Sequence, residues 1–145
     1  MMDLRILESL HGHAAILALA LLFHPALLLW RGRPLSFGSR VAVLSAGAMS
    51  ALAFALGIAI YPGYRAHVKP SLFMADPRAG LLFESKEHLA WLVLTLALGA
   101  SITALAAPRR ATNARRLSAR LFLGAALVAS LTAALGTYVT SVRGF

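Results

Sequence analysis

The sequence predicts an all-α integral membrane protein, an up-down bundle of four transmembrane helices. Of its 145 residues, 59% are hydrophobic and only 13% are charged, whereas about 25% of the residues of a soluble domain are charged. The apolar residues also gather in four segments, each close to the roughly 20 residues that a helix needs to cross a bilayer. We therefore expect one domain that has hydrocarbon as its solvent.

The predicted spans cover about residues 11–30, 41–61, 88–107 and 121–139. Backbone amide and carbonyl groups find no water in the hydrocarbon layer, so each span must be a helix. Pro25 should kink the first helix, and Pro108 ends the third. The first apolar run extends to Trp30, which is longer than the core of a cleaved signal peptide, so we expect this helix to be retained.

The connection between the second and third spans, residues 62–87, is the longest and is predicted to be a loop at the outer face. Asp76 and Pro77 are typical of a helix start, with Asp as N-cap and Pro in the first turn. A helix that begins there can run unbroken into the third span. The segment 61–70 is rich in aromatic and basic residues. It is expected to be an interfacial belt, or else a contact for an anionic head group or a quinone.

The arginines predict the orientation. The connections after the first and third spans contain no acidic residue but carry most of the arginines: Arg31, Arg33, Arg40, Arg109, Arg110, Arg115, Arg116 and Arg120. Cytoplasmic loops are enriched in Lys and Arg, so both connections are expected in the cytoplasm. Both termini and the 62–87 loop then face the outside, which is the periplasm if the membrane is a bacterial inner membrane. Because the basic residues of this chain, which has a net charge of +9, are distributed in this way, we expect them to contact membrane lipids and not nucleic acid.

Histidines in the spans are informative because ionisable side chains in membrane helices usually face the bundle interior. His13 and His24 are eleven residues apart in the first span, so they share one helical stripe and lie about 16 Å apart along the axis. His11 points about 200° away from His13, so only one of the two can face inward. The stripe shared with His24 favours His13 as the interior residue.

At the start of the third span, Glu84 and His88 are one turn apart and share a stripe with Thr95 and Gly99. A carboxylate in this position can orient the imidazole and fix its tautomer. The first and third helices are diagonal in an up-down bundle, and both begin at the outer face. His13 and His88 are therefore predicted at matched depth, as two axial ligands of a b-type haem require.

This hypothesis describes an electron-transfer protein or redox subunit with haem b near the outer face, in contact with quinone or a larger respiratory-type complex. The 62–87 connection supplies basic partners for the haem propionates, namely Arg65, His67 and Lys69. His24 lies deeper with no second histidine at its depth, so it is a weaker cofactor-binding candidate. In helix count and helical histidines the chain is similar to small four-helix b-type cytochromes, which have two ligand pairs where this sequence has one.

Two other classes remain open. A non-catalytic accessory subunit of a larger complex would dock through the apolar residues Phe73, Met74, Leu81, Leu82 and Phe83. A metal-binding or transport protein would use Glu84 and His88, with His13 opposite, to hold zinc or copper, or would form a pore as an oligomer. The chain lacks G-x-S-x-G, H-E-x-x-H and P-loop motifs, so an independent enzyme is not expected. The absence of cysteine excludes disulfides, thiolate metal sites and covalently attached c-type haem.

Overall fold

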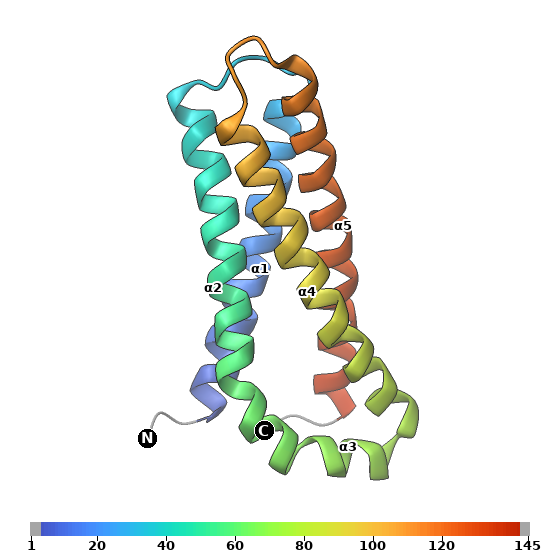
Figure 1. The fold of residues 1–145 in the computed structure, drawn as a ribbon. Coiled ribbons are helices and arrows are strands. Elements are labelled where there is room, and N and C mark those ends of the chain that lie inside the picture. Colours follow the sequence, from blue (N-terminus) through green and yellow to red (C-terminus); the bar gives the residue numbers. More distant parts are fainter. Residues whose placement is uncertain (1–3, 143–145) are drawn as a thin grey trace.

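The computed structural model describes residues 4–142, and they form four long helices and one short one (Figure 1). In chain order these are α1 (Leu4–Leu29), α2 (Phe37–His67), α3 (Lys69–Ala75), α4 (Pro77–Ala106) and α5 (Thr112–Val142). Each of the four long helices is long and apolar enough to cross a membrane. The predicted all-α bundle of four membrane-spanning helices is therefore confirmed.

The long helices alternate in direction and form a ring in which α1 packs against α2 and α5, and α4 packs against α5 and α2. As predicted, α1 and α4 are diagonal. The α1–α2 and α4–α5 connections lie at one end of the bundle, and α3 lies at the other end (Figure 1). We call these the arginine end and the α3 end.

The prediction that residues 62–87 form a loop is wrong, because nearly all of this segment is helical. Helix α2 continues past Pro62 to His67, and α3 follows after a single turn residue. Besides this residue, only Asp76 interrupts the helices, with an extended backbone, and its carboxylate accepts a hydrogen bond from the Arg78 amide at 2.9 Å. The predicted N-cap is thus confirmed, and α4 runs unbroken from this cap through the third span.

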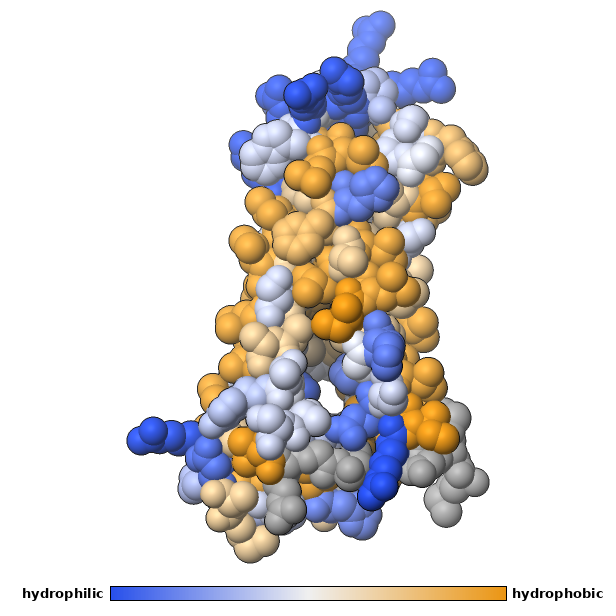
Figure 2. All heavy atoms as spheres, turned by 180° about the vertical axis from the view of Figure 1, so that it is seen from behind, coloured by the Kyte–Doolittle hydropathy of each residue, from blue (hydrophilic) through white to orange (hydrophobic). Residues whose placement is uncertain are grey.

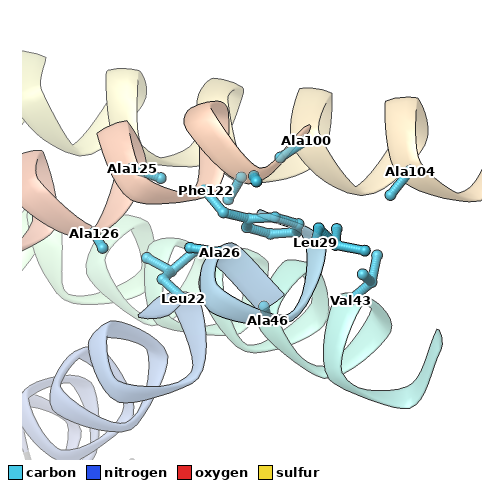
Figure 3. Close-up of a cluster of buried hydrophobic side chains, with 12 residues drawn as sticks. Leu22, Ala26, Leu29, Val43, Ala46, Ala100, Ala104, Phe122, Ala125 and Ala126 are labelled. Atoms are coloured by element: carbon cyan, nitrogen blue, oxygen red, sulfur yellow. The ribbon is translucent and has the colours of Figure 1, made fainter. Parts of the chain in front are cut away.

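The arginine end is held by an alanine-rich core, of which Figure 3 shows a close-up. Small side chains let the helices approach closely, as is common in membrane bundles. At Gly47 a Cβ atom would lie 2.7 Å from Ser101 Oγ, so α2 and α4 meet there without room for a side chain. The hydroxyl of Ser118 adds a bond between helices, donating to the Ala100 carbonyl at 2.7 Å. Phe122 is the largest apolar side chain of this cluster and is fully buried.

Arg115 closes this end of the bundle and is only 2% exposed. Its guanidinium donates to three backbone carbonyls, those of Gly32 at 2.9 Å, Pro108 at 2.9 Å and Arg109 at 2.8 Å. The acceptors belong to both connections of the arginine end. From sequence we predicted only a topology signal for Arg115, whereas the structure shows that it joins the two connections.

A second, smaller cluster holds the α3 end and comprises Tyr64, Val68, Leu72, Ala79, Phe83 and Val139. The rings of Tyr64 and Phe83 stack at 4.7 Å between centroids. Phe83 is 4% exposed, so the prediction that it belongs to a docking surface is wrong. Met74 and Leu81, from the same predicted surface, are 82% and 58% exposed.

Candidate functional site

Four ionisable side chains form a polar layer between the two apolar clusters. They are Glu8 and His11 on α1 and Lys86 and Glu87 on α4. In Figure 1 the α1–α2 pair and the α4–α5 pair move apart toward the α3 end. Figure 2 shows an opening through the lower half of the molecule, bordered by hydrophilic residues. This layer is the region where polar groups enter the bundle.

The packing partners of these side chains give the depth of the layer. On α4, Lys86 and Glu87 follow Phe83 of the second cluster and precede Ala97 of the first. On α5, Gly136 beside Lys86 lies between Ala126 of the first cluster and Val139 of the second. The polar layer is therefore enclosed by apolar packing on both sides along the bundle axis.

His11 is the partly buried imidazole of this layer. Its Nδ1 atom lies 2.9 Å from the Ala53 carbonyl on α2, and a Cβ atom at Gly57 would lie 3.1 Å from its Cε1. A carbonyl only accepts hydrogen bonds, so Nδ1 carries the hydrogen. The Nε2 lone pair of the neutral ring is then available as a base or as a metal ligand.

Lys86 brings a cation to the layer from the opposite side. Its Nζ lies 5.4 Å above the Phe83 ring centroid, and a Cβ atom at Gly136 would lie 3.7 Å from Nζ. Glu8 and Glu87 are close enough to act on it electrostatically, but within residues 4–142 neither carboxylate forms an ion pair with it. The ammonium thus has donor capacity for a bound group.

Glu87 provides an acceptor beside the lysine. Its Oε1 atom is buried and makes no hydrogen bond to any described residue. Buried carboxylate oxygens without a partner are rare, because each loses its bonds to water without compensation. Together, Lys86, His11 and Glu87 present one strong donor and two acceptors at similar depth.

The haem ligands predicted from sequence lie elsewhere. His13 and His88 are both exposed on the outer surface of the described bundle, and the Nδ1 of each donates to a carbonyl of its own helix, Ser9 at 2.7 Å and Glu84 at 2.8 Å. The prediction that His13 faces inward and His11 outward is therefore reversed. Helical phase correctly placed the two rings on different faces of α1, but it did not give the face that α1 turns toward its neighbours.

The other predicted site residues are brought together only in part. Lys69 Nζ and Glu84 Oε1 form an ion pair at 2.8 Å, so this carboxylate does not orient His88, which binds the backbone oxygen instead. The remaining candidates, His24, Arg65 and His67, are exposed. Residues 4–142 contain no cluster of three or more metal-binding side chains, so the zinc or copper set of His13, Glu84 and His88 is not assembled.

The ion pair also perturbs Lys69, which lies outside the long apolar helices. Its hydrogen bond to Glu84, together with the negative charges of Glu84 and Glu87, raises the pKa of the Lys69 ammonium above its usual value. The pair ties the start of α3 to the first turns of α4. Lys69 and Glu84, which were predicted to serve a haem, therefore join two helices.

None of the four residues of the site was predicted from sequence. Lys86 and Glu87 belong to the predicted 62–87 loop, Glu8 precedes the first predicted span, and His13 was preferred to His11. One signal could have found Lys86 and Glu87: ionisable residues 86–88 follow each other at the edge of an apolar run, and such residues are expensive in lipid unless they turn inward. Since consecutive residues point about 100° apart, part of this group had to face the bundle.

No protein family matches this chain, and neither a curated protein nor a solved structure resembles it significantly.

Proposed function

We propose that this protein binds the head group of a membrane-soluble quinone in the polar layer. The observation that carries the proposal is the placement of Lys86 Nζ and the free His11 Nε2 in an interior layer between two apolar clusters. Few ligands match both this polarity and this depth. A quinone does, because a flat ring with two polar edges is joined to a long apolar tail.

Each redox form of such a ligand finds a partner in the layer. A quinone carbonyl accepts a hydrogen bond from the Lys86 ammonium, and a quinol hydroxyl donates one to His11 Nε2 or to the Glu87 carboxylate. The stacked rings of Phe83 and Tyr64 close the layer on the α3 side. The apolar tail extends between the diverging helix pairs into lipid. By the distribution of arginines, the layer lies toward the outer face of a bacterial inner membrane.

A b-type haem is the second candidate, and the imidazole tautomers favour it. His11, His13 and His88 each donate Nδ1–H to a backbone carbonyl, which leaves Nε2 as the nitrogen that iron ligates. His11 offers this nitrogen inside the bundle. His13 and His88 offer it on opposite outer faces, so their haem would take its other ligand from a second polypeptide of a redox complex.

Quinone binding is tested by fluorescence quenching in dodecyl maltoside. The Trp30→Phe background leaves Trp91, which lies one turn above Glu87 on α4, as the reporter. Decylubiquinone should quench this signal in a saturable manner. Lys86→Met and His11→Leu should each weaken binding by about tenfold, the usual effect of losing a hydrogen bond to a charged or well-placed partner.

His13→Leu is the matched control, since it removes an exposed imidazole two residues from His11 and should leave the affinity unchanged. Circular dichroism and the melting temperature establish that each variant is folded. Equal affinity in all four proteins, or quenching that never saturates, would contradict the proposal. A pyridine haemochrome spectrum of protein expressed with added haem decides the second candidate, and its loss in His11→Leu, His13→Leu or His88→Leu identifies the ligand.

A further inference from the structure

The arginine end carries a second site that is separate from the polar layer. A surface pocket of about 340 Å³ lies beside the α1–α2 and α4–α5 connections and is lined by Trp30, Arg31, Arg116 and Arg120. We propose that this pocket binds the phosphodiester group of an anionic phospholipid, with Trp30 packing against the lipid at the membrane boundary.

The charge distribution leaves these arginines without a carboxylate partner among residues 4–142. The sequence has no Asp or Glu between Glu8 and Asp76 and none after Glu87, so the described carboxylates all belong to the α3 end. Arg116 and Arg120 are one turn apart on α5, where like charges repel, and Arg31 adds a third guanidinium. Within residues 4–142 none of the three forms an ion pair.

The neighbouring Arg115 shows what an internally satisfied arginine looks like in this region. All three nitrogens of its guanidinium donate to backbone carbonyls, those of Gly32, Pro108 and Arg109. A second pocket of about 300 Å³ includes Arg115 in its lining, with Arg40 and Arg109. The first pocket is the stronger anion site, because all three of its guanidinium groups have free N–H donors. A planar guanidinium can donate two parallel hydrogen bonds to a phosphate group.

The surroundings favour a lipid over a free anion. Trp30 is 55% exposed just after the end of α1, and Leu27 and Leu28 in the last turn of this helix are exposed too. Tryptophan is enriched where the hydrocarbon layer meets the head groups. In Figure 2 hydrophilic residues crowd the arginine end and give way to a hydrophobic belt below. Basic pockets between membrane helices at such a boundary bind phospholipid head groups.

Native mass spectrometry of the protein in dodecyl maltoside tests this site with three probes: phosphatidylglycerol, phosphatidylcholine and glycerol 3-phosphate. The wild-type protein should retain phosphatidylglycerol in preference to the other two. The double variant Arg116→Gln/Arg120→Gln should bind it about 25-fold more weakly, from about fivefold for each arginine near an anionic head group.

The matched control is Arg33→Gln/Arg110→Gln, which removes the same charge from the same end of the bundle at positions outside both pocket linings. It should keep most of the affinity. An equal loss of phosphatidylglycerol affinity in both double variants would show that only the net charge matters, and it would overturn the site. Equal retention of phosphatidylcholine, or displacement of the lipid by equimolar glycerol 3-phosphate, would overturn the assignment to an anionic lipid. Quinone quenching should be unchanged in Arg116→Gln/Arg120→Gln, so the two proposals fail separately.

Discussion

The two ends of the bundle use different packing. At the arginine end, glycine, alanine and serine bring the helices close around Phe122, and Arg115 ties the connections together. At the α3 end, a small cluster around the Tyr64–Phe83 stack lies beyond a layer that contains Glu8, His11, Lys86 and Glu87. Four membrane helices with similar composition thus form a tight half and an open, polar half.

This difference separates what holds the fold from what can bind a ligand. In lipid, helix association depends on close van der Waals contact and hydrogen bonds between helices, because burial of apolar surface gains little. The tight half therefore supplies most of the stability. The open half can tolerate ionisable groups that would weaken close packing, and such groups in membrane helices mark functional sites.

The largest effect is expected at the buried guanidinium of the tight half. Arg115→Ala removes three hydrogen bonds and leaves the carbonyls of Gly32, Pro108 and Arg109 without this donor. We expect a loss of about 3 kcal/mol or more, because bonds to charged groups contribute about 1.5–3 kcal/mol each. Unfolding by SDS in mixed micelles measures it. Arg116→Ala, an exposed neighbour, should stay within about 0.5 kcal/mol of wild type, and similar losses in both would refute the role of Arg115.

Two glycine substitutions test the close approach of α2 and α4. Gly47→Ala places a Cβ atom 2.7 Å from Ser101 Oγ, whereas a Cβ atom at Gly99 meets nothing within 4 Å. Overpacking at Gly47 should therefore destabilise the bundle by about 1–3 kcal/mol, and Gly99→Ala should be neutral or stabilising, since alanine favours a helix over glycine. The melting temperature in detergent measures both. If the two variants melt together, the tight half is less rigid than its contacts indicate.

The aromatic stack tests how the open half is held. Phe83→Leu keeps an apolar side chain but removes the ring that lies 4.7 Å from Tyr64. A loss of about 1 kcal/mol is expected, the usual contribution of an aromatic pair beyond its buried area. Phe37→Leu is the control, because Phe37 is 84% exposed. A loss at Phe83 as large as that of Arg115→Ala would show that the α3 end carries as much stability as the arginine end.

The smallest effect belongs to the Lys69–Glu84 ion pair. Its partner raises the pKa of Lys69, so the stabilising contribution is present at neutral pH and is lost as pH rises through the raised pKa of the folded state. Because the pair is partly exposed, we expect less than about 1 kcal/mol. Stability measured from pH 9 to pH 12 should fall more in wild type than in Lys69→Gln. Parallel curves would show that the pair contributes nothing.

The residues that could be predicted from sequence are those whose signal is local. Asp76 and Pro77 form an N-cap by their own chemistry, and α4 begins there. Residues 62–67 give the opposite lesson: they were predicted to begin a loop, yet α2 continues through Pro62 to His67, because proline removes only one amide hydrogen-bond donor from the helix. The burial of Arg115 was not foreseen, since its acceptors are backbone carbonyls of two different connections.

The sequence by itself determined that this chain is a four-helix membrane bundle, since hydrophobic length and charge distribution are properties of each segment alone. Only the tertiary structure decided that His11 and Lys86, rather than His13 and His88, face inward. A helix in water reveals its buried face by amphipathic contrast. A helix in lipid is apolar all round, so its rotation is set by the fit of glycines, alanines and serines against its neighbours.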